Sequence, residues 1–149
     1  MVKNKMNYYM ETKLVRAEPC KQETGEDGYK IVYPDGYASW SPKDVFEAAY
    51  MQITPNSSLK TDKPSISQQM VDAFIRGTQV LTMGEKTTVV RVVLANGFEI
   101  VESSSCVSAE NYDEALGAQI CMEHIKDKVW MLLGFLLQTA VHGIKLEDG

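Results

Sequence analysis

A long apolar stretch toward the C-terminal end of the chain constrains the fold most. Residues 129–137 read Val-Trp-Met-Leu-Leu-Gly-Phe-Leu-Leu, and they continue a polar, capped helix that we expect to begin at Ser108 and to end at His142. A helix that is hydrophobic on every side has to be covered on every side. The rest of the chain or a second copy must therefore pack around residues 129–137, and we expect a homo-oligomer that forms through this helix.

The segment before the long helix predicts an antiparallel sheet. Residues 87–94 are rich in β-branched side chains, and residues 98–102 alternate apolar and polar side chains. Between them, Asn96-Gly97 favours a type I′ turn, in which both central residues have positive φ. Residues 78–83 are short and β-prone, so they predict a further strand beside this hairpin.

The N-terminal part of the chain predicts a second, smaller unit. Residues 29–33 and 37–40 flank Pro34-Asp35-Gly36, a turn in which proline presets φ and glycine accepts a positive φ. A short helix should follow at once, with serine as the N-cap and proline at the first helical position in Ser41-Pro42. Residues 1–53 therefore predict a β-β-α module.

A polar segment separates the two predicted modules. Residues 54–65 contain two prolines and almost nothing to bury, which is typical of a linker. Residues 66–149 should then form a helix that starts at Ser65 or Ser67 and runs to about Arg76, followed by the hairpin and the long helix. The predicted class is α+β: a small antiparallel sheet with a long C-terminal helix and one or two further helices, and an N-terminal β-hairpin with a short helix.

Charge and cysteine content limit the environment and the partners. The formal net charge is −5, and residues 66–149 hold 6 basic against 11 acidic groups, a net charge of −5 for that half alone. Duplex-binding proteins draw affinity from Lys and Arg that neutralise phosphates, so we expect no duplex nucleic acid as partner. Three irregularly spaced cysteines, and a start that does not resemble a signal peptide, indicate free thiols in a cytoplasm. The longest apolar run is about half of the ~20 residues that a membrane span needs, so we expect no membrane partner.

No residue pattern announces catalysis or metal binding. Cys121 and His124 have ligand-like spacing, but zinc sites need four protein ligands, or three and a water, and the chain has no second Cys/His pair. A nucleophilic Cys121 or Cys106 would need an electropositive setting, whereas Glu123 and Asp127 surround this part of the helix with negative charge. Phosphate loops, dinucleotide fingerprints and metalloprotease motifs are missing from the sequence. We therefore expect no metal, no cofactor and no enzymatic activity.

Five residues are candidates for ligand binding. Arg91 lies in the middle of a valine-rich strand, where it either faces solvent on an open sheet face or contacts an anion there together with Arg76, Asn96 and Phe98. Trp40 allows two readings as well, since it either packs the N-terminal hairpin or offers a platform for a base or ring. Phosphate contacts would fall to Arg91 and Arg76, a polar edge to Asn96, and stacking to Phe98 or Trp40.

The C-terminal half resembles a known family. The segments Thr-Val-Val-Arg-Val-Val-Leu-Ala-Asn-Gly-Phe-Glu (88–99), Glu-Ser-Ser-Ser-Cys-Val-Ser-Ala-Glu-Asn-Tyr-Asp (102–113) and Lys-Val-Trp-Met-Leu-Leu-Gly-Phe-Leu-Leu (128–137) are similar to the small phage proteins of the gene-49/gene-66 type. The similarity extends over residues 87–138. Ala109 stands where this family usually has proline, and Met131-Leu132-Leu133 replaces a more polar Pro-Leu-Glu, which makes the helix more apolar than the family pattern.

The resemblance implies a setting rather than an activity. It indicates a non-virion protein of a phage or prophage, located in the host bacterial cytoplasm. Small phage proteins of this architecture include sponges that sequester nucleotide immune signals, so by analogy we expect a non-catalytic counter-defence protein that binds a cyclic nucleotide or an ADP-ribose derivative. The alternative is an acidic protein that binds and inhibits a host enzyme or defence protein.

Overall fold

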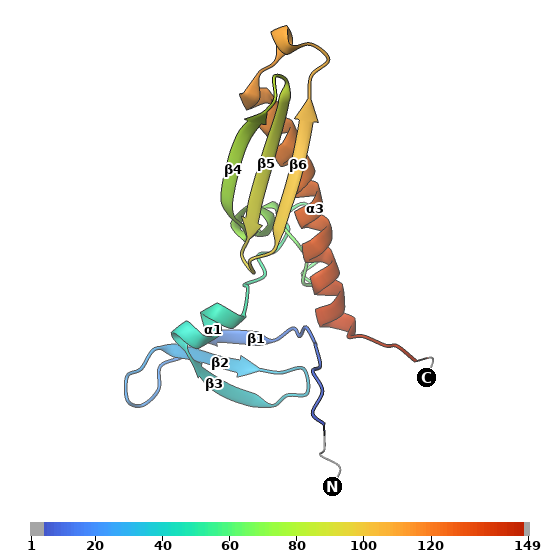
Figure 1. The fold of residues 1–149 in the computed structure, drawn as a ribbon. Coiled ribbons are helices and arrows are strands. Elements are labelled where there is room, and N and C mark those ends of the chain that lie inside the picture. The colour runs from blue at the N-terminus through green and yellow to red at the C-terminus, as the bar shows by residue number, and fades with distance from the viewer. Residues whose placement is uncertain (1–4, 148–149) are drawn as a thin grey trace. The chain divides into compact units, whose positions relative to one another are not determined.

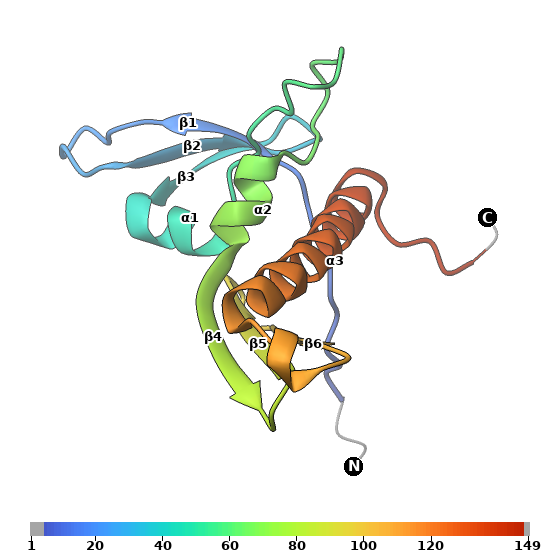
Figure 2. The same ribbon diagram turned by 90° about the horizontal axis from the view of Figure 1, so that it is seen from above.

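A computed structural model describes residues 5–147 of the chain and confirms the α+β class (Figures 1 and 2). The described residues form two antiparallel sheets of three strands each, in the orders β1-β2-β3 and β4-β5-β6. The elements are β1 (Arg16–Pro19), β2 (Gly28–Val32), β3 (Ala38–Pro42), α1 (Lys43–Ala49), α2 (Gln68–Phe74), β4 (Ile75–Met83), β5 (Thr87–Leu94), β6 (Glu99–Ser105), a 3₁₀ turn (Ala109–Asn111) and α3 (Glu114–His142). None of these helices is long and apolar enough to cross a membrane.

The chain divides into two compact units. The first unit takes in the described parts of Met1–Gln52 and Leu136–Gly149, and the second consists of Ile53–Phe135. The predicted division at residues 54–65 stays a prediction, and its outer ends at residues 1 and 149 lie outside the described residues. Within the predicted linker, the Asn56 side chain donates a hydrogen bond to the Ile66 carbonyl at 2.9 Å, and the Asn56 amide donates to Ser65 Oγ at 3.2 Å. These two bonds join Asn56 to Ser65 and Ile66 and so close the segment into a loop.

The first unit packs α1 against β1-β2-β3 through aromatic rings. Tyr29 on β2 stacks on Phe46 of α1 with ring centroids 4.2 Å apart, and Phe46 stacks in turn on Tyr50 at 4.7 Å. Ile31, two residues along β2 from Tyr29, is 3% exposed. Alternate residues of a strand share a face, so the two side chains lie on the helix side of this sheet.

The structure confirms the hairpin around Pro34–Gly36 and corrects the start of the helix after it. Gly36 has φ +89° and donates a hydrogen bond to the Tyr33 carbonyl at 2.9 Å. The predicted N-cap Ser41 belongs instead to β3, which continues through Pro42, and Pro42 pairs with Gly28. Helix α1 begins at Lys43, after Pro42, and has no side-chain cap. An edge strand tolerates proline because its outer N–H groups need no partner. Strand β3 can therefore continue through Pro42, and the helix starts only after it.

The second unit packs α2 and α3 against one face of β4-β5-β6 (Figures 1 and 2). Along β5, every second residue from Thr88 to Leu94 is buried. Helix α3 contributes a stripe of five buried residues at intervals of four: Gly117, Cys121, Ile125, Val129 and Leu133. Within the apolar segment 129–137, Val129 and Leu133 are therefore buried against the sheet side, while Met131 is 66% exposed.

The turn at Asn96-Gly97 joins β5 to β6, but it is not the predicted type I′ turn. Gly97 has φ +86°, whereas every described residue other than glycine has a negative φ. Gly97 donates a hydrogen bond to the Leu94 carbonyl at 2.8 Å, and Leu94 donates to the Phe98 carbonyl at 2.8 Å. This pattern is the three-residue hairpin loop in which a type I turn precedes a left-handed glycine. Asn96 keeps its negative φ because only one left-handed residue is needed.

Two predicted helix ends are also wrong. Ser67 caps α2 as predicted, with its hydroxyl 3.3 Å from the Met70 amide, but α2 ends at Phe74 and Arg76 lies in β4. The long helix begins at Glu114 rather than at Ser108, since Ser108 caps only the 3₁₀ turn. The carboxylate of Asp113 accepts the Leu116 amide at 3.2 Å and takes the capping role for α3.

Candidate functional site

The candidate site is the face of β4-β5-β6 that points away from α2 and α3. Because side chains alternate along a strand, the residues between the buried ones on β5 lie on this face. The pairing register places Arg91 between Gln79 of β4 and Val101 of β6. We call this surface the open face; its strand residues are Gly77, Gln79, Leu81, Met83, Thr87, Val89, Arg91, Val93, Glu99, Val101, Ser103 and Ser105.

The open face combines exposed apolar side chains with one ion pair. Leu81, Met83 and Val101 are 39%, 60% and 56% exposed. The Arg91 guanidinium forms an ion pair and a hydrogen bond with the Glu99 carboxylate, and the two side chains are 43% and 50% exposed. Arg91 therefore lies on the open face, as both sequence readings require, and its charge is balanced by a neighbour.

Three other predicted site residues belong to the same sheet. Arg76 sits at the irregularity between Ile75 and Gly77 where β4 shifts its register against β5, and its side chain is exposed. Asn96 uses its side-chain oxygen to accept the Phe98 amide at 3.1 Å, and Phe98 is 58% exposed. Asn96 and Phe98 thus lie at the β5-β6 turn, whereas the ion-pair partner of Arg91 is Glu99.

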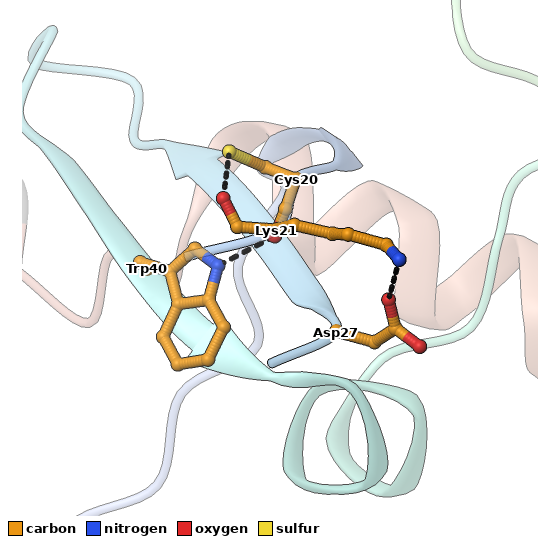
Figure 3. Close-up of polar contacts among 4 residues, drawn as sticks. All are labelled: Cys20, Lys21, Asp27 and Trp40. Atoms are coloured by element: carbon orange, nitrogen blue, oxygen red, sulfur yellow. Dashed lines mark hydrogen bonds and ion pairs between the residues drawn. The ribbon is translucent and has the colours of Figure 1, made fainter. Parts of the chain in front are cut away.

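Trp40 lies in the other unit and has a structural task there. Its Nε1 donates a hydrogen bond to the Cys20 carbonyl at 2.7 Å (Figure 3). Its ring lies against Gly28, where an added Cβ would be only 2.2 Å from the nearest Trp40 atom. Trp40 therefore packs within the N-terminal hairpin, and Trp40 and Arg91 belong to different units.

Sequence reasoning missed a cluster of hydroxyl groups beneath the start of α3. The Tyr112 hydroxyl is 2.8 Å from Thr88 Oγ1 and 2.7 Å from Thr82 Oγ1, and Thr82 also bonds to the Glu114 carboxylate. Thr88 is fully buried against Gly117. Isolated threonines and a tyrosine 24 residues beyond Thr88 carry no sequence signal, so only the fold reveals that they meet.

Cys121 and His124, the pair with ligand-like spacing, differ in burial. Cys121 is fully buried, and its thiol lies 3.9 Å from the Thr88 carbonyl oxygen. Burial, and secondarily the negative charge of Glu102, raise the pKa of the Cys121 thiol above its usual value. His124 is exposed. Among residues 5–147, no group of three or more His, Cys, Asp or Glu side chains is arranged to hold a metal ion.

The comparison with family models gives one match. A model described as a phage protein family, named for N4 Gp49 and phage Sf6 gene 66, matches residues 66–141. The match spans α2, the whole β4-β5-β6 sheet and nearly all of α3, so it contains Arg91 and its open face but excludes Trp40. No curated protein and no solved structure matches the chain.

Proposed function

We propose a non-catalytic counter-defence role in the host bacterial cytoplasm for this protein. The chain belongs to the phage protein family of N4 Gp49 and phage Sf6 gene 66. The protein binds and sequesters a small nucleotide that signals in host immunity. The observation that carries this proposal is Arg91, a half-exposed guanidinium at the centre of the open face with apolar side chains around it.

The chemistry of this surface suits a nucleotide. A guanidinium offers paired N–H donors to phosphate oxygens, in a geometry that a phosphate matches well. Val89 and Val93 flank Arg91 on β5, and Val101 lies across from it on β6, so apolar side chains that could contact a base border the cation along β5 and toward β6. The open face therefore supplies the two kinds of contact that a nucleotide requires.

The polar groups beside Arg91 favour binding over catalysis. The nearest carboxylate, that of Glu99, is held by the Arg91 guanidinium, and the cross-strand neighbour Gln79 offers a neutral amide. A general base needs a carboxylate or imidazole that is free to take a proton from the substrate. The absence of catalysis is part of the proposal.

Calorimetric titration tests the proposal. Purified protein is titrated with cyclic dinucleotides, cyclic trinucleotides and cyclic ADP-ribose products, and Arg91→Ala is compared with the matched variant Gln79→Ala on the same row of the sheet. Loss of a charge-assisted hydrogen bond should weaken binding by about 10- to 100-fold in Arg91→Ala. Gln79→Ala should change affinity by less than about threefold, because it removes no charge.

Two outcomes would refute this proposal. If none of these nucleotides binds, the sponge role is wrong. If a nucleotide binds equally well to the parent protein and to Arg91→Ala, the ligand is not held on the open face. Ligand recovered unchanged after incubation supports sequestration, whereas chemical conversion of the ligand would show that the protein is an enzyme.

Self-association through α3 belongs to the same proposal. Met131 is 66% exposed on the side of α3 opposite the buried stripe, within the apolar segment 129–137. Light scattering after size exclusion should give an oligomer for the parent protein and a smaller species for Met131→Glu. Leu116→Glu is the control, because Leu116 is 55% exposed on α3 but lies outside the apolar segment. A monomeric parent protein would contradict this part.

The acidic surface favours a second candidate function. Residues 66–149 carry a net charge of −5, from 6 basic and 11 acidic groups, which suits a basic surface on a host enzyme or defence protein. Pull-down from host lysate at low and high salt separates the two functions. A sponge needs no host protein, whereas an inhibitor should retain one host protein whose binding weakens as salt rises.

A further inference from the structure

The first unit contains a surface hollow of about 300 Å³ that the proposed function does not use. The hollow lies between the end of β1, the loop that leads into β2, and the first residue of α1. The residues that line it are Pro19, Cys20, Lys21, Asp27, Gly28, Tyr29 and Lys43. Its volume is at the lower end of the range for small-molecule sites, about 300–1,000 Å³.

The loop that forms one wall is held rigidly. Cys20 donates a backbone hydrogen bond to the Gly28 carbonyl at 2.8 Å, and the Lys43 amide donates to the Asp27 carbonyl at 3.1 Å. Trp40 also holds this loop, since its indole N–H donates a hydrogen bond to the Cys20 carbonyl (Figure 3). These bonds fix both ends of the loop, and the shape of the hollow is therefore set before any ligand arrives.

Two of the residues that line the hollow are lysines, Lys21 and Lys43, and the ion pair of each ammonium group is long. Lys21 Nζ is 3.6 Å from an Asp27 carboxylate oxygen, and Lys43 Nζ is 3.5 Å from a Glu47 oxygen. Charge-assisted hydrogen bonds are usually shorter, about 2.7–2.9 Å, and these four side chains are all at least 42% exposed. Ion pairs of this kind contribute little to stability, so a ligand can replace them at small cost.

We propose that this hollow is a binding site for a small organic phosphate. Lys21 and Lys43 neutralise the phosphate dianion from two sides, and Tyr29 forms an apolar wall for the organic part. The site is separate from the open face, because every residue that forms it belongs to the first unit. Its existence does not depend on the nucleotide role of Arg91.

Titration with inorganic phosphate, followed by backbone amide NMR shifts, tests the site. As phosphate is added, the NMR signals of the Asp27 and Lys43 backbone amides should shift and then reach a plateau. Lys21→Ala and Lys43→Ala should each weaken binding by about 30-fold, as expected for the loss of one unit charge about 4 Å from a dianion in water. The matched control is Lys30→Ala on β2, since Lys30 is exposed and lies on the sheet face opposite Tyr29.

A second series distinguishes the ligand class. Sulfate and acetate are titrated at matched ionic strength, and glycerol phosphate represents a phosphate with an organic part. The proposal requires glycerol phosphate to bind at least as tightly as inorganic phosphate and acetate to bind least. Absence of saturable shifts, equal shifts in the double variant of Lys21 and Lys43, or equal binding of acetate would each overturn it.

Discussion

Gly117 allows the closest approach of α3 to the sheet, and replacing it with alanine gives a sharp test of the fold. A Cβ at Gly117 would lie 2.1 Å from Thr88 Oγ1 and 2.8 Å from Thr88 Cβ. Thr88 is fully buried on β5, and its hydroxyl is 2.8 Å from the Tyr112 hydroxyl. The added methyl group therefore has to displace a side chain that cannot move without losing a hydrogen bond.

The magnitude follows from two opposing terms. Overpacking of a close-packed core costs about 1–3 kcal/mol, and loss of the Thr88 hydrogen bond adds about 1 kcal/mol. Alanine in a helix gains about 0.5–1 kcal/mol over glycine. Gly117→Ala should therefore lower the free energy of unfolding by roughly 1–3 kcal/mol, the difference of these terms.

Gly134 supplies a control on the same helix. No heavy atom beyond its neighbours and its own helix backbone lies within 4 Å of a Cβ built at Gly134. Gly134→Ala should therefore show the helix gain alone and stabilise the protein by about 0.5–1 kcal/mol. Because both variants share this gain, the gap between them measures the contact at Gly117, about 2–4 kcal/mol.

Urea unfolding followed by helical circular dichroism measures these changes, with the oligomeric state of the variants matched. Thr88→Ala in the Gly117→Ala background should recover part of the loss, since Oγ1 is removed while the Cβ at 2.8 Å remains. Equal stability changes for Gly117→Ala and Gly134→Ala would show that α3 does not approach β5 as closely as described.

Three further outcomes are expected. Burial raises the pKa of the Cys121 thiol, so a thiol reagent at pH 8 should modify exposed Cys20 at once and Cys121 only after unfolding; rapid modification of Cys121 in the native protein would contradict its burial. Asn56→Ala removes the side-chain hydrogen bond to the Ile66 carbonyl, one of the two bonds that close the 54–65 loop, and should raise the rate at which trypsin cleaves this loop severalfold; an unchanged rate would argue that this bond does not hold the loop closed. The hydrogen bond from Gln68 lowers the pKa of Asp72 below 3.8, so the carboxylate adds stability above pH 3.8 that is lost as the pH falls; Asp72→Asn should flatten the acid end of the stability profile, and an unchanged profile would contradict this.

Periodicity predicted the elements of the second unit well, because burial on one face leaves a strong pattern. Residues 87–94 were predicted as a strand with the correct bounds, and the long helix was predicted with the correct end at His142. Its start was wrong because Ser108 and Asp113 are both good caps. In the structure Asp113 caps the long helix, and Tyr112 just before it bonds to Thr88, a contact that the local sequence does not contain.

The ends of elements were predicted less well where two local preferences competed. Ser41-Pro42 is a good helix start, yet pairing with β2 extends the strand through Pro42. Asn96-Gly97 suits a type I′ turn, yet the chain forms a three-residue loop with one left-handed glycine. In both places the outcome depends on the register of a neighbouring strand, which the local sequence does not contain.

The candidate site was predicted in part for the same reason. Alternation along β5 was enough to place Arg91 on one face of a sheet. It did not reveal the Glu99 partner, because that partner depends on how β6 pairs with β5. Trp40 was grouped with Arg91 by residue type alone, and the two residues lie in different units.

The ion pair on the open face sets a threshold for any anion that approaches Arg91. Glu99 is tethered beside the guanidinium, and a tethered group competes like a free one at an effective concentration of about millimolar or above. A metabolite with a single carboxylate, present below this effective concentration, competes poorly with the Glu99 carboxylate for the Arg91 guanidinium. In the proposed role, a signal with two or more phosphates is attracted to the guanidinium more strongly than a single carboxylate, since it carries more negative charge. In the proposed nucleotide role, Glu99 thus disfavours singly charged anions at Arg91.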